Sequence, residues 1–215
     1  MQSTRKQGLR GTVRRTKADS DATAASLLIE ATRQFAERGY AAVSIEDIAV
    51  GAGVTRGAVA HHFGTKRHLF ERVLARTQEA VGDQVADAAD LIEDPWLAFE
   101  AGCRAFLEQC LAPSVRRIVM IDGPAVLGWD TWRGHDAATS GRHLADALDG
   151  LVDQGIVDIE SVPATTALLS GAMNEAALWV ASQPEESALT EAWSDLRRLL
   201  VAMRTSPRDH GPDQT

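Results

Sequence analysis

The segment from Ser44 to Phe63 constrains the fold of this chain more than any other stretch of its sequence. It reads SIEDIAVGAGVTRGAVAHHF, in which Ser44 can cap a short helix and Gly53 can take the positive φ of a tight turn. Ala49 is small enough for two helices to cross closely at its position. The predicted inner face consists of Ile45, Ile48, Val54 and Val59. This layout is typical of a DNA-binding helix-turn-helix, and an ordinary helical hairpin with a glycine turn is the alternative.

Helices predicted on both sides of this segment favour the helix-turn-helix. Upstream, Ser20 or Asp21 can cap a helix that Gly39 ends, and downstream Thr65 can cap a helix that begins at Lys66. The upstream helix has an apolar stripe of Ala24, Leu28, Ala31 and Phe35. The residues that we expect to contact DNA are Ser44, Thr55, Arg56, Gly57, Ala58, His61, His62 and Lys66.

This part of the chain resembles the N-terminal domain of TetR-family transcriptional regulators. The resemblance covers roughly residues 20–75 and rests on FAERGY at 35–40, IEDIA at 45–49, GVTRG at 53–57, HHF at 61–63 and KRHLF at 66–70. Residues 122–129 (DGPAVLGW) and 171–178 (GAMNEAAL) resemble one subgroup of the same family. The resemblance implies an all-α fold, in which a three-helix DNA-binding domain precedes a larger helical domain for ligand binding and dimerisation.

One position departs from the family pattern. TetR-like proteins usually carry an aromatic residue, most often Tyr, directly before the His-His-Phe segment, and it commonly contacts a DNA phosphate. Here that residue is Ala60. Phosphate contacts position a protein on DNA and raise its affinity but carry little sequence information. We therefore expect each subunit to lack one phosphate contact, which weakens DNA binding without abolishing it.

The charge is divided unevenly along the chain. The formal net charge is −8, but residues 1–80 hold 13 Lys and Arg against 8 Asp and Glu, a net of +5. Residues 81–215 hold 9 against 22, a net of −13. DNA repels an acidic surface, so only the basic N-terminal part is expected to face a duplex.

We divide the chain into four parts. Residues 1–19 are predicted to be a basic, disordered arm that can reach phosphates or the minor groove once the protein is on DNA. Residues 20–66 form the predicted helix-turn-helix domain, 67–205 the predicted effector-binding and dimerisation domain, and 206–215 a disordered tail.

Proline and glycine signals divide the larger domain into helices. Asp94 followed by Pro95 is a strong helix start, and Gly155 is expected to end a helix. The predicted helices run from Lys66 to about Leu91, over 95–111, over 114–121 with an end at Gly123-Pro124, from near Gly128 to Gln154, over 164–182, and over 187–204.

The last two predicted helices indicate a dimer. Residues 164–182 are apolar nearly all round, and residues 187–204 carry a single apolar stripe. A two-fold dimer that pairs both helices into a four-helix bundle would bury these faces, whereas packing within one subunit is the alternative. The residues expected at the dimer interface are Gly171, Leu178, Leu189, Trp193, Leu196 and Leu200.

The TetR resemblance also implies a small-molecule effector among the central helices, although aromatic residues at helical spacing more often form core. We expect an apolar or aromatic effector, with Arg104, Arg116, Asn174 or Glu175 as polar anchors. The expected pocket residues are Phe99, Cys103, Phe106, Met120, Trp129, Trp132, Asn174 and Trp179.

Other classes of protein find little support in the sequence. Cys103 and Cys110 are spaced about 10 Å apart on one helix, too far for a disulfide, so we expect core residues rather than a redox switch. His135, Asp136 and His143 lack the short spacing usual for metal ligands. No catalytic motif, signal peptide or run of eighteen apolar residues occurs, and we expect no cofactor and no metal.

The sequence thus predicts a cytoplasmic, homodimeric, sequence-specific DNA-binding regulator. Its binding site would be a palindromic operator in double-stranded DNA, and as a repressor it would be released by a small molecule. An activator, an effector-independent DNA binder and, with least support, an all-helical enzyme are the alternatives.

Overall fold

The computed structural model describes residues 17–183, 185 and 187–205. Every regular element among them is helical, apart from an isolated antiparallel bridge between Val157 and Arg204. The elements are α1 (Lys17–Ala42), α2 (Ile45–Gly51), α3 (Arg56–Phe63), α4 (Lys66–Asp90), α5 (Pro95–Leu111), α6 (Pro113–Val115), the π-helix η1 (Arg116–Asp122), α7 (Gly123–Leu127), α8 (Trp129–Ala138), α9 (Ser140–Asp153), α10 (Val162–Ser182) and α11 (Ala188–Ala202). The predicted all-α fold class is confirmed. No helix in this part of the chain is both long enough and apolar enough to span a bilayer.

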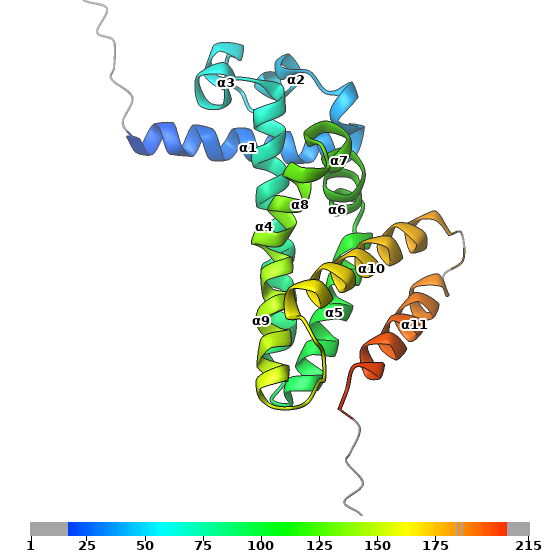
Figure 1. Cartoon of the computed structure of the whole chain (residues 1–215). Coiled ribbons are helices and arrows are strands. Elements are labelled where there is room, and N and C mark those ends of the chain that lie inside the picture. The colour runs from blue at the N-terminus through cyan, green and yellow to red at the C-terminus, as the bar shows by residue number, and fades with distance from the viewer. Residues whose placement is uncertain (1–16, 184, 186, 206–215) are drawn as a thin grey trace, which may run out of the picture.

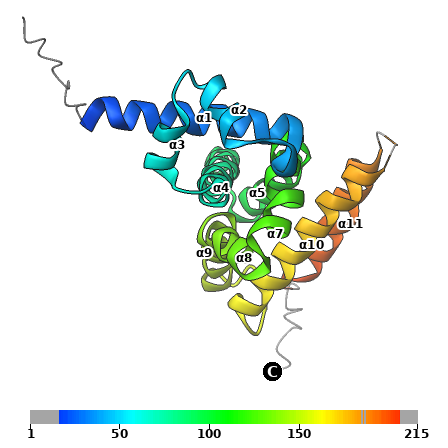
Figure 2. The same ribbon diagram turned by 90° about the horizontal axis from the view of Figure 1, so that it is seen from above.

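Helices α1 to α3 form a head at one end of the long helix α4, and α1 crosses α4 there (Figures 1 and 2). Three aromatic rings join the head to the start of α4. The ring of Phe70 lies 5.3 Å from that of Phe35 and 5.0 Å from that of Tyr40, both in edge-to-face arrangements. Such pairs add to the stability from burial, so the head is held firmly on α4.

The body consists of helices packed along α4. Helix α5 lies beside α4, α9 lies along the other side of α4, and α10 and α11 are outermost (Figures 1 and 2). At Gly102 of α5 a Cβ would make an ordinary van der Waals contact, 3.5 Å from Val85 Cγ1, so α5 lies directly against α4 there. Leu107, Ile118 and Leu148 are fully buried between these elements.

Most of the predicted helix boundaries are confirmed. Thr65 caps α4 by accepting a hydrogen bond from the backbone N–H of His68 at 3.1 Å. Asp94 caps α5 through the N–H of Leu97 at 2.9 Å, and Pro95 is the first residue of that helix. Gly39 interrupts the regular geometry of α1 with a φ of +77°. The predicted arm lies largely outside the described residues, as does the predicted tail, but Lys17 to Asp19 already belong to α1.

The prediction that Gly123-Pro124 ends a helix is wrong. Gly123 has helical angles (φ −52°, ψ −65°), and the helical path continues to Leu127. In the π-type turn before it, residue 124 would donate to the carbonyl of residue 119, but proline has no N–H to donate. The indole Nε1–H of Trp132 instead donates to the Val119 carbonyl at 2.8 Å. A tertiary hydrogen bond thus satisfies the group that Pro124 leaves free.

The prediction of one helix from Gly128 to Gln154 is also wrong. Thr139 leaves the helical region (φ −123°, ψ −104°) and separates α8 from α9. Its hydroxyl donates to the carbonyl of His135 at 3.0 Å, which gives the chain a local alternative to the helical hydrogen bond. Gly141 permits the sharp change of direction, because a Cβ there would lie 3.1 Å from the Asp136 carbonyl oxygen.

Candidate nucleic-acid interface and ligand cavity

Ser44 and Asp47 fix the start of α2. The hydroxyl of Ser44 accepts a hydrogen bond from the N–H of Asp47 at 3.0 Å, and the Asp47 carboxylate accepts one from the N–H of Ser44 at 2.9 Å. This reciprocal pair is a capping box. The backbone N–H of Ser44 holds the pKa of Asp47 below its usual value. Ser44, expected at the DNA interface, therefore has its side chain engaged in the helix cap.

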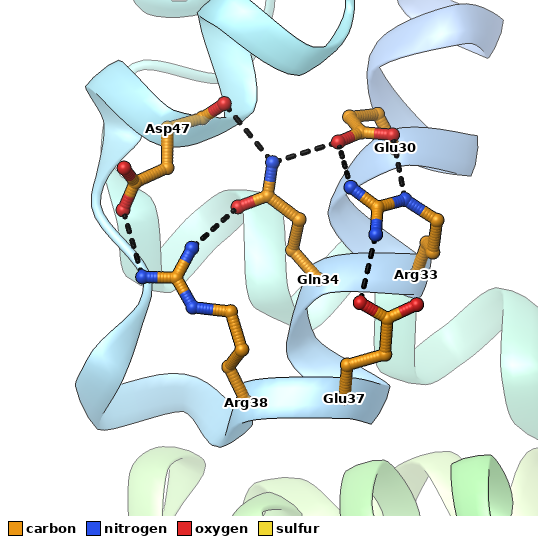
Figure 3. Close-up of polar contacts among 6 residues, drawn as sticks. All are labelled: Glu30, Arg33, Gln34, Glu37, Arg38 and Asp47. Carbon is orange, nitrogen blue, oxygen red and sulfur yellow. Dashed lines mark hydrogen bonds and ion pairs between the residues drawn. The ribbon is translucent and has the colours of Figure 1, made fainter.

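A polar network from α1 holds the same corner in place (Figure 3). Gln34 is buried, and its Nε2 donates to the Asp47 carbonyl at 3.0 Å and to Glu30 Oε1 at 2.7 Å. Arg38 Nη2 lies 3.3 Å from Asp47 Oδ2. Hydrogen bonds from Arg33 and Gln34 lower the pKa of Glu30. Because these contacts join α1 to α2, the helix-turn-helix has a rigid base.

Helix α3 presents its N-terminal end to solvent. Thr55 caps it by accepting from the N–H of Ala58 at 3.2 Å, while Val59 and Phe63 anchor the opposite face in the core. Of the expected DNA contacts, the exposed ones are Thr55, Arg56, Gly57 and His61, and the half-buried ones are Ser44, Ala58, His62 and Lys66. Gly53 has a φ of +68°, as the tight turn requires.

Arg56 and Lys66 have partners within the chain that the sequence analysis missed. Arg56 Nη1 lies 2.6 Å from Glu46 Oε1, but both side chains are more than half exposed, so this ion pair contributes little stability. Lys66 Nζ lies 4.1 Å from the centroid of the Tyr40 ring. Partial burial there lowers the pKa of Lys66, and the charges of Asp122 and Asp47 offset part of that effect. Ala60 is exposed on α3, so a larger side chain fits at this position.

The head is joined to the body where α1 meets η1. Asp122 Oδ2 accepts a hydrogen bond from the N–H of Tyr40 at 2.7 Å and lies 3.3 Å from Arg117 Nε. Arg117 lies over Gly39, where a Cβ would approach its guanidinium carbon to 2.6 Å. Near the start of α4, Arg67 Nη2 donates to the Leu127 carbonyl of α7 at 3.0 Å. The Tyr40 contact thus joins α1 to η1, and the Arg67 contact joins α4 to α7.

A cavity of about 340 Å³ lies in the body between α4, α5, α8, α9 and α10. Three of the eight expected pocket residues line it: Phe99, Cys103 and Phe106. The other five are Met120, Trp129, Trp132, Asn174 and Trp179, and none of them lines this cavity. Met120, Trp132 and Asn174 are buried elsewhere, whereas Trp129 is 64% exposed and Trp179 is 42% exposed.

The expected polar anchors do not line the cavity either. Arg104 Nε is bound to Glu108 at 2.8 Å, Arg116 Nη1 donates to the Ala181 carbonyl at 3.3 Å, and Glu175 is exposed. The polar residues that do line the cavity, and that sequence reasoning missed, are Asp90, Asp136, Ser140, His143, Asp146, Gln154 and Ser170. The sequence did contain an indication of this cavity, because the small residues Ala86, Ala89 and Gly102 leave space between α4 and α5.

The cysteines and the histidines of the body have no arrangement for redox or metal chemistry. Burial raises the pKa of the Cys103 and Cys110 thiols to about 12, which disfavours the reactive thiolate. His135 faces Glu71 at 3.5 Å, whereas His143 lies against Gly82. No group of three or more potential ligands in the described part of the chain could hold a metal ion.

The expected dimer residues fall into two sets. Leu196 and Leu200 are buried within the subunit, Leu189 and Trp193 are half-buried, and α11 is tied to α5 by an ion pair between Arg197 and Glu100 at 3.0 Å. Gly171 and Leu178 of α10 are exposed, and Leu178 is 37% accessible. On the same face Leu168 is 74% exposed. The outward apolar surface therefore includes Leu168 and Leu178 of α10 as well as Leu199 and Val201 of α11.

The similarity to known proteins covers both parts of the chain. Residues 27–73 match the family described as bacterial regulatory proteins, tetR family, and residues 96–203 match a tetracyclin repressor-like C-terminal domain. The regulator TtgR of Pseudomonas putida is 41% identical over 78 residues, which cover 36% of this chain and 37% of that protein. The regulator AcrR of Shigella flexneri is 31% identical over 108 residues, half of each chain.

A crystal structure extends the likeness over the full fold. A TetR-family transcriptional regulator from Pectobacterium atrosepticum is 35% identical and has a TM-score of 0.75, covering 90% of this chain and all of that one. Its extent matches both the head and the body described above. The chain therefore belongs to the TetR family of transcriptional regulators.

Proposed function

We propose that this protein is a homodimeric repressor that binds a palindromic operator through α3 and leaves it when a small molecule fills the cavity of the body. The observation that carries the proposal is the exposed N-terminal end of α3 within residues 1–80, whose net charge is +5, followed by residues 81–215 with a net charge of −13. Such a charge distribution directs only the N-terminal part of the chain toward DNA. A DNA-binding transcriptional regulator acts on the chromosome, so we place this protein in the cytoplasm.

We assign recognition of the operator's base sequence to the start of α3. Thr55 and Arg56 lie at the end of the helix that would enter the major groove first, where side chains reach base edges. His61 and Lys66 are assigned to the phosphates, since both lie farther along the chain from that end.

The dimer is assigned mainly to α10. Leu168, Gly171, Glu175 and Leu178 recur at three- and four-residue intervals on its exposed face, and a Cβ at Gly171 would meet open space. Exposed apolar stripes of this kind mark interfaces. A two-fold axis beside α10 would also present two heads to the two halves of one operator.

Release is assigned to the contacts between the cavity and the head. Asp136 lines the cavity and accepts hydrogen bonds from Arg133 and Ser170, and the adjoining Trp132 donates to Val119 of η1. Asp122 at the end of η1 holds the N–H of Tyr40 in the head. A ligand that prefers a different setting of α8 would change the position of the head and lower DNA affinity by its differential binding energy.

Recovery of protein-bound genomic fragments tests the DNA-binding proposal. The expected result is enrichment of a palindromic site, and substitutions at Thr55 or Arg56 should change the preferred base pairs. An Arg76→Ala variant is a matched control, because this exposed arginine lies ten residues along α4 from its first residue. Enrichment spread uniformly across the genome, without a common site, would overturn the proposal.

Sedimentation of a Leu168→Glu variant tests the dimer. A charge at the exposed Leu168 of the proposed interface should convert the dimer to a monomer. Leu91→Glu is the control, because Leu91 is equally apolar and exposed but ends α4, far along the chain from α10. Retention of the dimer by Leu168→Glu would show that α10 is not the interface.

A further inference from the structure

The chemistry of the cavity wall restricts the ligand that it can hold. One part of the wall is apolar and consists of Phe99, Cys103, Phe106, Leu144 and Met173, from α5, α9 and α10. Its residues on α9 run from Ser140 to Gln154, fourteen positions that span roughly 21 Å. The space is therefore elongated and suits a slender apolar or aromatic body.

Most ionisable residues of the cavity wall are acidic and carry negative charge. Asp90, Asp136 and Asp146 line the cavity with His143, and no lysine or arginine is among its described lining residues. Arg133 lies behind Asp136 and compensates one of the three negative charges. An anionic ligand would thus meet unfavourable charge throughout, whereas a cationic ligand would meet a net negative wall.

Asp136 is the buried member of this set, with only 5% of its surface exposed. Its Oδ2 accepts hydrogen bonds from Arg133 Nη1 at 3.0 Å and from Ser170 Oγ at 2.9 Å. Its Oδ1 accepts none from the residues that the structure describes and is not one of their fully enclosed polar atoms without a partner, so water or a ligand can reach it. Both oxygens of a carboxylate can accept hydrogen bonds, and Oδ1 is therefore free to accept one from a ligand. Burial raises the pKa of Asp136, although Ser170 and Arg133 offset part of this effect.

We propose that the cavity binds an organic ammonium compound, with its apolar body against Phe99 and Phe106 and an N–H of its protonated amine donated to Asp136 Oδ1. The inference rests on the proposed function, because it names the class of molecule that acts at the effector cavity. Asp90 and Asp146 are exposed and contribute at longer range, so solvent screens them more strongly. A neutral phenol or alcohol could supply the hydrogen bond but not the positive charge.

Calorimetric titration of the full-length protein at pH 7 with three matched probes tests this assignment. The probes are 4-phenylbutylamine, 4-phenylbutanol and 4-phenylbutanoate, which share one skeleton and differ in charge; the amine is fully protonated at this pH because its pKa is close to that of lysine. The ammonium should bind at least about tenfold more tightly than the alcohol, because both can donate a hydrogen bond to Asp136 but only the ammonium adds the attraction between opposite charges. The carboxylate should bind most weakly. A carboxylate that binds as tightly as the ammonium would overturn the proposal.

Two variants locate the charge preference. Asp136→Asn keeps the shape of the side chain and removes its charge, so the ammonium should lose about tenfold in affinity while the alcohol changes little. Asp149→Asn is the control, because Asp149 is an exposed residue of α9 that does not line the cavity. An Asp136→Asn protein with a native circular dichroism spectrum and an unchanged ammonium preference would refute the assignment.

A further variant keeps the test decisive if Asp136→Asn fails to fold. Asp90→Asn/Asp146→Asn removes the two exposed charges and should narrow the ratio of ammonium to carboxylate affinity by a few fold. An unchanged ratio would count against a charge-selective cavity. The experiment distinguishes failure of the ligand class from failure of the proposed function. If the ammonium binds but does not release operator DNA, the proposed release mechanism is wrong. If only the carboxylate releases operator DNA, the proposed ligand class is wrong.

Discussion

Substitution of Gly39 by alanine should destabilise the protein by about 2–3 kcal/mol. Its backbone (φ +77°, ψ +161°) lies in a region that other residues rarely adopt, which costs on the order of 1–3 kcal/mol. The new Cβ would also displace the guanidinium of Arg117, whose carbon lies 2.6 Å from that position, and so break its contact with Asp122. That ion pair is partly exposed and contributes at most about 1 kcal/mol.

Urea unfolding of a double-mutant cycle separates the two contributions. Arg117→Ala alone should cost about 0.5 kcal/mol. Adding Gly39→Ala to that variant should then cost only the backbone contribution, because the ion pair is already absent, which gives a coupling of about 0.5 kcal/mol. Gly134→Ala is a matched control: Gly134 lies within α8, and a Cβ there meets open space, so it should be neutral or stabilise by up to about 1 kcal/mol. A Gly39→Ala protein within about 0.5 kcal/mol of wild type would refute the reasoning.

Four further outcomes are expected. Ser44→Ala removes the capping hydroxyl of α2 and should lower the free energy of unfolding by about 1 kcal/mol, measured in urea. Lys66→Ala should weaken binding to all DNA sequences alike and flatten the slope of log affinity against log salt by about 1 per subunit, whereas loss at a single operator base would contradict a phosphate contact. Ala60→Tyr should strengthen binding to all DNA sequences with little change in this slope, because a tyrosine hydroxyl donates a hydrogen bond to a phosphate but neutralises no charge, and an unchanged affinity would refute the missing contact. Burial in the folded protein raises the pKa of Asp136 above its value in the unfolded chain, so over this pH range the folded state holds its proton more tightly. As the pH rises from about 4 through the raised pKa, wild type should therefore lose stability relative to Asp136→Asn. A constant difference between these two proteins across the pH range would exclude this linkage.

Local chemistry made the head and several helix boundaries predictable from sequence. Asp94 and Pro95 define the start of α5 because an N-cap and a first-turn proline act within a few residues. The same holds for Thr65 at α4, and for Gly53, whose positive φ follows from its place between two short helices. Each of these features depends on neighbours in the chain rather than on the tertiary fold.

The errors occurred where distant residues decide the structure. Pro124 fits into a continuous helical path because the indole of Trp132, thirteen residues after Val119, satisfies the carbonyl that the proline leaves free. Trp129 was expected in the pocket because it is large and aromatic, yet it follows Gly128 at the start of α8 and lies mostly in solvent. Aromatic content therefore does not identify the wall of a cavity that five separate helices line.

The junction between the head and the body combines apolar and polar contacts. The rings of Phe35 and Tyr40 pack on Phe70 of α4, and the N–H of Tyr40 donates to Asp122 of η1. Under the proposed mechanism, a ligand can shift the setting of the head only by its differential affinity for the two settings. A single hydrogen bond contributes about 1 kcal/mol, so the contact of Tyr40 with η1 is weak enough for the binding of a small molecule to overcome.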